Sequence, residues 1–289
     1  MKDHIGRRPT LLTLAVLIAL FGSCFAATVP AEAAAGRRYD LIRGVRFATP
    51  EKVELECDVY RPRADGPHPG VLVIHGGAWA IGTRQQLFHI CRHLAANGFV
   101  AVTVDYRLAP AYKFPAQLDD VRAGLDWMIE HAEQYKIDPE RLAAWGYSAG
   151  GHLATLLGSQ DARLRAVVAG GAPCDLRALA GKERKLAYFL GGTAEEVPQV
   201  YDAASPVTHA SADDPPMFFY HGELDLLVPP AQPKAMIAAL KKAAVAARLF
   251  LVPKAGHQAA LISPSAIREG RKFLAEKLLR QPPGETNVE

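Results

Sequence analysis

A serine lies at the centre of the most informative short motif in the chain. Residues 146–150 read Gly-Tyr-Ser-Ala-Gly and fit the pattern G-x-S-x-G, which places Ser148 between an apolar run at 141–147 and a small-residue run at 149–157. The first run predicts a strand and the second predicts the start of a helix. In such a turn the glycines let the backbone close sharply, and the hydroxyl lies at a helix N-terminus that favours developing negative charge. The motif therefore predicts Ser148 as a nucleophile; a glycine-rich helix start without a catalytic role is the alternative.

Two further side chains could activate that serine. A serine nucleophile needs a general base, and the base needs a carboxylate that orients it. Asp225 follows a predicted strand at 217–220, and His257 follows another at 248–252. Open α/β sheets bind ligands beyond the carboxyl ends of their strands, and the order serine, acid, histidine is typical of chains with this motif. The spacing thus predicts Asp225 as the acid and His257 as the base.

Other residues compete for these two roles. Glu223 is an alternative to Asp225, because it occupies the same segment after the strand. His209 and His221 precede the last predicted strand, so we interpret both as loop or packing residues. His257 is the histidine that completes the ordered set.

A second glycine-containing motif could bind the charge that develops during acyl transfer. Residues 75–79 read His-Gly-Gly-Ala-Trp and directly follow a buried strand predicted at 71–74. Backbone N–H groups in such a loop, together with the N–H that follows the nucleophile, form an oxyanion hole. We interpret His75 as a structural residue that holds the loop. The predicted donors are the N–H groups of Gly77, Ala78 and Ala149.

Two aromatic residues adjoin these predicted catalytic groups. Trp79 ends the loop motif, and Tyr147 directly precedes the nucleophile. Both are predicted to contact the substrate, because an aromatic ring beside the reacting serine can line an acyl pocket. Packing within the core is the alternative for Trp79.

These motifs need a scaffold in which strands and helices alternate. After two neighbouring strands at 39–47 and 53–60, short continuous apolar runs alternate with stretches of helical periodicity. Continuous apolar runs are typical of strands buried on both faces of a parallel sheet. The sequence therefore predicts an α/β fold with a mostly parallel sheet and helices on both faces. Further strands are predicted at 71–74, 99–104, 141–147, 164–169, 217–220 and 248–252, and helices at 87–96, 116–134, 149–157, 231–244 and 260–279.

The remaining segments suggest how the chain is divided. Residues 175–216 are rich in Ala, Asp and Pro and lack one long periodic helix, so we expect a small lid-like insertion over the carboxyl edge of the sheet. A surface insertion without function is the alternative. We expect one catalytic domain over 36–280 and a disordered tail at 281–289.

The first 35 residues indicate targeting rather than folding. Basic residues precede an apolar run at 11–21, which is short for a bilayer span, and small residues follow it. We therefore expect a signal segment at 1–35 and a periplasmic or secreted protein; a buried N-terminal helix is the alternative. Cys24 lies in a sequence that weakly resembles a lipoprotein processing site. The exported protein could therefore be anchored to a membrane by a lipid at Cys24.

Composition argues against several other function classes. Lys and Arg number 33 against 30 Asp and Glu, a net charge of +3 without a dense basic patch, so nucleic-acid binding has no electrostatic support. The four cysteines, at positions 24, 57, 91 and 174, are scattered. This spacing argues against a metal site built on cysteine and leaves disulfide bonding open.

The sequence resembles the esterase and lipase family of α/β-hydrolases, particularly its hormone-sensitive-lipase-like and small bacterial feruloyl- or acetyl-esterase branches. Besides the motifs above, the resemblance includes Asp-Tyr-Arg-Leu-Ala-Pro at 105–110, Ile-Asp-Pro-Glu-Arg at 137–141, Gly-Tyr-Ser-Ala-Gly-Gly-His at 146–152 and Ser-Pro-Val at 205–207. It implies the α/β-hydrolase fold and an esterase that needs neither a metal nor an organic cofactor. Ala78 departs from the family, because many relatives have glycine there; alanine keeps the N–H, but its methyl group narrows the space beside the substrate. A large N-terminal cap domain is also lacking, which suggests an open site that admits bulky esters.

The motifs and the resemblance together lead us to expect a serine carboxylic-ester hydrolase that forms an acyl-enzyme. The resemblance suggests short-chain or aromatic acyl esters, either as small molecules or linked to polysaccharide. An amidase or peptidase with the same triad is the nearest alternative. A non-catalytic binding module is another, although such modules typically lose a triad residue or the turn that carries the serine.

Overall fold

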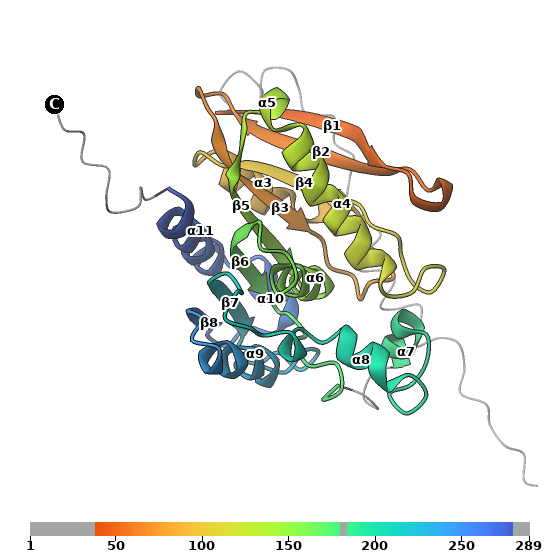
Figure 1. Cartoon of the computed structure of the whole chain (residues 1–289). Helices are drawn as coiled ribbons and strands as arrows, with labels where there is room; N and C mark the ends of the chain where they lie inside the picture. The colour runs from red at the N-terminus through yellow and green to blue at the C-terminus, as the bar shows by residue number, and fades with distance from the viewer. Residues whose placement is uncertain (1–37, 180–183, 280–289) are drawn as a thin grey trace, which may run out of the picture. The chain divides into compact units, whose positions relative to one another are not determined.

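An eight-stranded sheet runs through the part of the chain that the computed structural model describes, residues 38–179 and 184–279 (Figure 1). The strand order is β1-β2-β4-β3-β5-β6-β7-β8. β1 pairs antiparallel with β2, and β2 with β4, whereas every other pairing is parallel. The strands are β1 (Tyr39–Ala48), β2 (Leu55–Pro62), β3 (His68–Ile74), β4 (Val100–Val104), β5 (Ile137–Tyr147), β6 (Leu164–Gly170), β7 (Met217–Gly222) and β8 (Ala247–Val252).

Helices or 3-10 turns connect most of these strands, whereas a loop alone joins β2 to β3. The longer ones are α3 (Phe88–Ala95), α4 (Ala116–Glu130), α6 (Ala149–Gly158), α9 (Ala231–Lys242) and α11 (Pro264–Leu278). The shorter ones are α5 (Ala132–Tyr135), α7 (Arg184–Leu190), α8 (Pro198–Ala203) and α10 (His257–Leu261), with 3-10 turns η1 (Pro50–Lys52), η2 (Arg84–Leu87) and η3 (Pro206–Thr208). None of the helices within the described ranges is long and apolar enough to cross a lipid bilayer.

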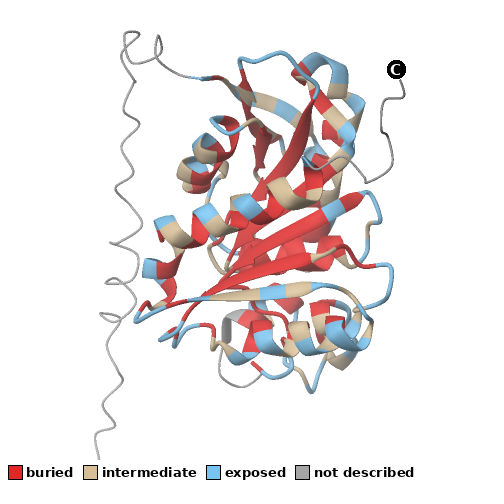
Figure 2. Ribbon diagram, turned by 90° about the vertical axis from the view of Figure 1, so that its left-hand side faces the viewer, coloured by how far each residue is buried: buried red, intermediate tan, exposed pale blue. Residues whose placement is uncertain are grey.

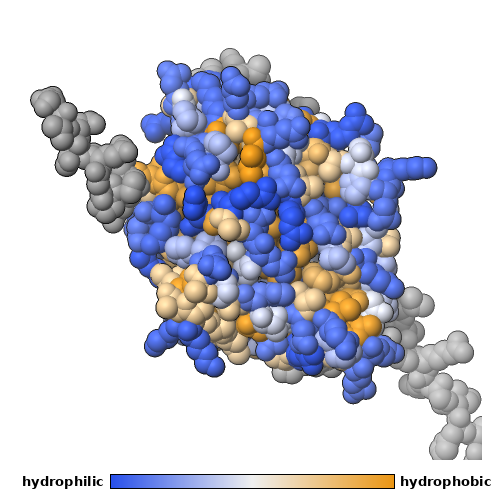
Figure 3. Space-filling model, in the orientation of Figure 1, coloured by the Kyte–Doolittle hydropathy of each residue, from blue (hydrophilic) through white to orange (hydrophobic). Residues whose placement is uncertain are grey.

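Strand residues alternate between two apolar cores, one on each face of the sheet. In β3, Leu72 and Ile74 belong to the core that includes residues of α4, α6 and α9, whereas Val71 and Val73 belong to the core with residues of α3 and α11. Successive side chains of a strand point to opposite faces, so a strand covered on both faces must be apolar throughout. Figure 2 shows the central strands buried along most of their length, and the surface in Figure 3 is mostly polar with small apolar patches. The predicted α/β fold class is confirmed.

The predicted helix at 260–279 is divided into two helices in the structure. Pro264 lacks a backbone N–H and disfavours helical backbone at the residue before it. Ser263 is accordingly extended, and its hydroxyl accepts the N–H of Ala266 as the N-cap of α11. The single predicted helix was wrong, because apolar periodicity continues across a break that the proline imposes.

Two other predicted boundaries also differ. The predicted helix at 116–134 is α4 followed by α5, and the predicted strand at 141–147 begins four residues earlier, at Ile137. Ile137 and Asp138 pair with His68 and Pro69 of β3, before a register shift. The polar residues at the start of β5 concealed this pairing, because local sequence does not show which segment lies alongside.

Residues 175–216 contain α7, α8 and η3, with 180–183 outside the described residues. Two short helices agree with the absence of one long periodic pattern, and the lid role of this segment stays a prediction. The predicted signal segment at 1–35, with Cys24, and the predicted tail at 281–289 also lie outside the described residues.

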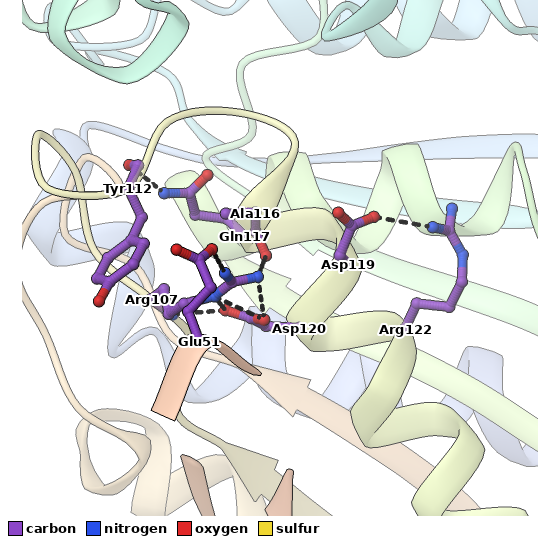
Figure 4. Close-up of polar contacts among 8 residues, drawn as sticks. All are labelled: Glu51, Arg107, Tyr112, Ala116, Gln117, Asp119, Asp120 and Arg122. Carbon is purple, nitrogen blue, oxygen red and sulfur yellow. Dashed lines mark hydrogen bonds and ion pairs between the residues drawn. The ribbon is translucent and has the colours of Figure 1, made fainter. Parts of the chain in front are cut away.

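A buried ion pair fixes the loop that follows β4 (Figure 4). Arg107 in this loop donates to the carboxylate of Asp120 in α4 from Nη2 at 2.8 Å, from Nε at 2.9 Å and from its backbone N–H at 2.8 Å. Both side chains are almost fully buried, and Nη1 contacts the carboxylate of Glu51 in η1. Breaking such a pair leaves a buried charge without a partner. The pair therefore ties the Asp-Tyr-Arg-Leu-Ala-Pro segment to the helix that covers β3 and β4.

We expect Arg107→Met to lower the free energy of unfolding by about 3–5 kcal/mol, the usual cost of breaking a buried pair. Arg122→Met is the matched control, because Arg122 forms an exposed pair with Asp119 on the same helix (Figure 4). Exposed pairs contribute only about 0–1 kcal/mol. Urea unfolding of wild type and both variants measures the difference; equal stability of the two variants would contradict the prediction.

Candidate active site

The structure brings together three side chains that are distant in the sequence. His257 Nε2 lies 3.0 Å from Ser148 Oγ, and His257 Nδ1 lies 2.6 Å from Asp225 Oδ2. Ser148 follows β5, Asp225 follows β7, and His257 opens α10 after β8, so all three lie beyond the carboxyl ends of parallel strands. Because an ionised carboxylate only accepts, Nδ1 carries the hydrogen and Nε2 is left to accept from the serine hydroxyl. This is the arrangement by which a histidine activates a serine.

A strained turn between β5 and α6 presents the hydroxyl of Ser148. The residue has φ 56° and ψ −121°, a backbone conformation that residues with side chains rarely adopt. Its N–H donates to Gly170 O at 2.7 Å, which helps to hold the turn. A Cβ atom on Gly146 would lie 2.0 Å from Gly150 O, and one on Gly150 would lie 2.0 Å from Ile74 O. Close backbone contacts therefore require both glycines of the motif.

Asp225 is buried, yet its surroundings favour the ionised form. Oδ1 accepts the backbone N–H groups of Leu227 at 3.0 Å and Val228 at 2.9 Å. Burial alone would raise the pKa of Asp225, but hydrogen bonds from His221 and His257 outweigh burial and hold that pKa well below its ordinary value. Asp225 is thus a fixed negative charge beside the imidazole of His257.

Two of the alternatives for the acid and the base, Glu223 and His209, make other hydrogen bonds. Glu223 is exposed, and its Oε2 accepts the N–H of Lys254 at 2.9 Å rather than a hydrogen from His257. His209 Nε2 lies 2.9 Å from Ala203 O, at the end of α8. Neither side chain is hydrogen-bonded to Ser148 or His257 in the described part of the chain.

The loop at 75–79 packs directly against the turn that carries Ser148. A Cβ atom on Gly76 would lie 3.2 Å from the Cβ of Ser148. Gly77, Ala78 and Trp79 all have positive φ, at 113°, 51° and 59°, which gives the loop a tight left-handed course. The predicted oxyanion donors Gly77, Ala78 and Ala149 therefore lie on the two segments that meet beside Ser148, and their role stays a prediction.

His75 has contacts that suit a structural residue. Its Nδ1 lies 2.8 Å from Gly76 O, and its ring stacks on that of Tyr106 with centroids 4.2 Å apart. Burial lowers the pKa of His75 to about 4, although the bond to Gly76 opposes this shift. These contacts hold the start of the loop in place.

The two aromatic residues predicted to contact substrate are both buried. Trp79 is 4% exposed; its Nε1 donates to His152 Nδ1 at 3.1 Å, and its ring stacks on Phe189 of α7 with centroids 4.3 Å apart. Tyr147 is 2% exposed, and its hydroxyl donates to the backbone oxygen of His257. Trp79 thus connects the loop at 75–79 to the segment at 175–216, and Tyr147 supports His257. Their predicted contacts with substrate stay predictions.

The sequence matches the family model BD-FAE over residues 57–240, a stretch that includes Ser148, Asp225 and the loop at 75–79. The chain belongs to the BD-FAE family. The resemblance to the esterase and lipase family of α/β-hydrolases is thereby confirmed.

Among curated proteins, a mycobacterial relative is similar to part of this chain. The BD-FAE chain is 33% identical over 204 residues to "Probable carboxylic ester hydrolase LipM" of Mycobacterium tuberculosis, covering 63% of this chain and 47% of that protein. It spans about half the length of the curated relatives it matches first.

Two solved structures share the fold of this BD-FAE member. A truncated carbohydrate esterase from gut microbiota superimposes with a TM-score of 0.78 and 22% identity, covering 85% of this chain and 99% of that chain. The esterase Est2 of Thermogutta terrifontis does so with a TM-score of 0.70 and 24% identity, covering 86% and 95%. These likenesses support the α/β-hydrolase fold.

His152 is a buried polar residue beside the candidate site; the resemblance included it as the last residue of a motif, without a role of its own. It lies one turn after Ser148 on α6; its Nδ1 accepts from Trp79, and its Nε2 lies 2.6 Å from Ala204 O. Since the carbonyl only accepts, Nε2 carries the hydrogen. His152 lies four residues after Ser148, a spacing that places both residues on the same face of a helix. This spacing could have indicated from the sequence that His152 lies near the nucleophile. His152 thus joins the loop at 75–79 to the end of α8.

The buried histidines predict how stability responds to acid. Burial lowers the pKa of His75 and of His152 to about 4, below the ordinary value of 6.5 that the unfolded chain has. Between these values the unfolded chain binds protons that the folded protein does not, so stability is full above pH 6.5 and falls as the pH is lowered. Each histidine contributes a slope of about 1.4 kcal/mol per pH unit in this window.

We therefore expect His152→Gln to flatten the dependence of unfolding free energy on pH by the contribution of one histidine. Urea unfolding at several pH values between the two pKa values measures both slopes. If the unfolding free energy had the same dependence on pH in wild type and variant, the burial of a neutral His152 would be contradicted.

Within residues 38–179 and 184–279, no group of three or more His, Cys, Asp or Glu side chains is arranged to hold a metal ion. Cys57, Cys91 and Cys174 are buried free thiols. These thiols lie in the cores of the BD-FAE chain.

Proposed function

We propose that this chain is a serine hydrolase that cleaves carboxylic esters by acyl transfer. The observation that carries the proposal is the hydrogen-bonded series Ser148, His257 and Asp225, with the serine on a strained turn at a helix N-terminus. The printed names of relatives, such as the carboxylic ester hydrolase LipM and the ethyl acetate hydrolase of Pseudomonas putida, support an ester as the substrate.

The proposed reaction has two steps. His257 Nε2 takes the hydroxyl proton as Ser148 Oγ attacks the ester carbonyl, and Asp225 stabilises the resulting imidazolium. The N–H groups of Gly77, Ala78 and Ala149 bind the oxyanion; each donor contributes about 2.7–4 kcal/mol of transition-state stabilisation. His257 then gives its proton to the leaving alcohol, which departs, and the acyl group stays on Ser148. In the second step His257 activates water, which releases the acid and restores the serine.

Short-chain or aromatic acyl esters are the proposed substrates, as small molecules or linked to polysaccharide. A carbohydrate esterase among the structural neighbours supports the second form. Leu224, Leu226 and Leu227 flank Asp225 and are 58%, 95% and 48% exposed, which gives the surface around the site an apolar part suited to aliphatic or aromatic groups.

Hydrolysis of p-nitrophenyl acetate, butyrate and decanoate, beside p-nitroacetanilide, tests this proposal. We expect turnover that falls as the acyl chain lengthens and far exceeds cleavage of the anilide. Preference for the anilide would favour an amidase instead, and no turnover of any substrate by folded protein would contradict the proposal.

A further inference from the structure

His221 lies beside the carboxylate that orients the proposed base, and the reaction outlined above does not use it. It is the penultimate residue of β7, and its side chain is fully buried. Its Nε2 lies 2.7 Å from Val228 O and 3.3 Å from Asp225 Oδ2. A single ring nitrogen therefore faces two oxygens of the turn that carries Asp225.

These two oxygens determine which nitrogen of His221 carries the hydrogen. A carbonyl oxygen and an ionised carboxylate can only accept, so the hydrogen is on Nε2 and is shared between them. Nδ1 is buried and has no hydrogen-bond partner among the described residues. A second hydrogen, on Nδ1, would be a buried donor without an acceptor, which is costly. His221 thus presents the hydrogen on Nε2 to Val228 O and to Asp225 Oδ2.

The hydrogen bonds of Asp225 show what this donor adds. Backbone N–H groups of the turn occupy Oδ1, whereas Oδ2 faces the two histidine side chains. His257 gains and loses a proton in each proposed turnover, whereas His221 has no part in this proton transfer and donates from Nε2 throughout. The carboxylate oxygen that orients His257 therefore has a second, constant donor.

We propose that His221 is a positioning residue, which fixes Asp225 Oδ2 toward His257 Nδ1 through its own Nε2–H. The proposal rests on the proposed function, because it gives His221 a part in the same reaction. It assigns to His221 an effect on turnover rather than on substrate binding, since the ring is buried behind Asp225 and the reacting atoms touch His257.

A purely structural role is the competing interpretation. The shorter of the two distances is the one to Val228 O, and a bond there would stabilise the turn even if Asp225 gained nothing. Such a role would change stability in proportion to the lost bond and would leave the pH dependence of turnover unmoved. The two roles therefore differ in a measurable way.

Three variants separate these roles: His221→Gln, His221→Asn and His221→Leu. The amide nitrogen of glutamine occupies nearly the position of Nε2 and can donate to the same oxygens, whereas the amide of asparagine is one methylene too short. Leucine fills the volume without a donor. The Asn and Gln variants are thus a matched pair with the same chemistry and a different reach.

We expect His221→Asn and His221→Leu to lower kcat for p-nitrophenyl acetate by about tenfold to one hundredfold, the usual effect of losing a hydrogen bond to a charged group. KM should be unchanged, and His221→Gln should retain most of the wild-type kcat. Without the second donor, Oδ2 attracts the proton on His257 more strongly, so the acid limb of the kcat/KM profile should move to higher pH.

The pH profile can be interpreted because the neighbouring titratable groups are known. The ring of Tyr147 packs against His257, and that of Tyr220 packs against Tyr147; burial raises the pKa of both phenols, so both stay protonated across the profile. Glu223 is exposed and bonded to the backbone of Lys254. If the acid limb of the kcat/KM profile shifts in both the Asn and Leu variants but not in the Gln variant, the shift reports the hydrogen bond from residue 221 to Asp225.

Stoichiometric reaction with a fluorophosphonate gives the active fraction of each protein, so that kcat is counted per folded site. Wild-type kcat and an unmoved acid limb in the Asn variant would overturn the proposal, as would equal losses in the Asn and Gln variants. If the Leu variant does not fold, the Asn and Gln pair decides alone. Failure of the wild type to hydrolyse the ester would instead refute the proposed function.

Discussion

Ser148→Ala is expected to lower kcat for p-nitrophenyl acetate by about a millionfold, the loss that follows removal of a triad serine. No other hydroxyl is hydrogen-bonded to the imidazole ring of His257 in the described residues, so the variant has no acyl acceptor at the base. The residual rate should come from the oxyanion donors and from substrate binding, and it should proceed without a burst of p-nitrophenolate.

Stopped-flow measurement of the burst, with the steady-state rate from the same traces, checks this result. Ser211→Ala is the matched control, because Ser211 is an exposed serine that bonds to Asp214, away from the triad. The control should behave as wild type. Retention of more than a small fraction of wild-type kcat by the Ser148 variant would show that another residue carries the acyl group.

Asp225→Asn is expected to lower kcat by about ten-thousandfold, as happens when the orienting carboxylate of a triad becomes an amide. The reason lies in the two backbone N–H groups of Leu227 and Val228, which need an acceptor at the Oδ1 position. They would direct the amide oxygen toward themselves and the NH₂ group toward His257 Nδ1. His257 would then carry its hydrogen on Nε2 and could not accept the proton of Ser148.

Steady-state kinetics with p-nitrophenyl acetate measures this loss, with KM expected to change little. Glu223→Gln is the control, because Glu223 is the competing carboxylate two residues away and is exposed. Its kcat should stay near that of the wild type. The opposite pattern, with the Glu223 variant inactive and the Asp225 variant active, would assign the acid role to Glu223.

Much of the scaffold and of the site could be predicted from local sequence. The continuous apolar run at 71–74 predicted a strand buried on both faces, and β3 contributes to the core on each side. The G-x-S-x-G motif predicted a strand-to-helix turn, and Ser148 lies between β5 and α6. Both predictions depend on neighbouring residues alone. The first depends on the alternation of side chains along a strand, and the second on the small residues that a sharp turn requires.

What could not be predicted depends on contacts between distant segments. Trp79 and His152 are 73 residues apart, and their hydrogen bond has no trace in local periodicity. The pairing of Ile137 with His68 has none either. His221 was interpreted as a loop or packing residue, although it lies in β7 with its ring nitrogen near Asp225, because the direction of a side chain depends on the folded turn. Long-range geometry, rather than residue type, decides these features.

Covalent labelling is the measurement that tests the central proposal most directly. Wild-type protein is incubated with a fluorophosphonate, its intact mass is measured, and the modified peptide is identified after proteolysis. The proposed triad predicts one phosphonyl group per chain, attached to Ser148, and none on the Ser148→Ala or Asp225→Asn variants within the same time. No label on folded wild-type protein, or a label on another residue, would contradict the proposal that Ser148 is the nucleophile.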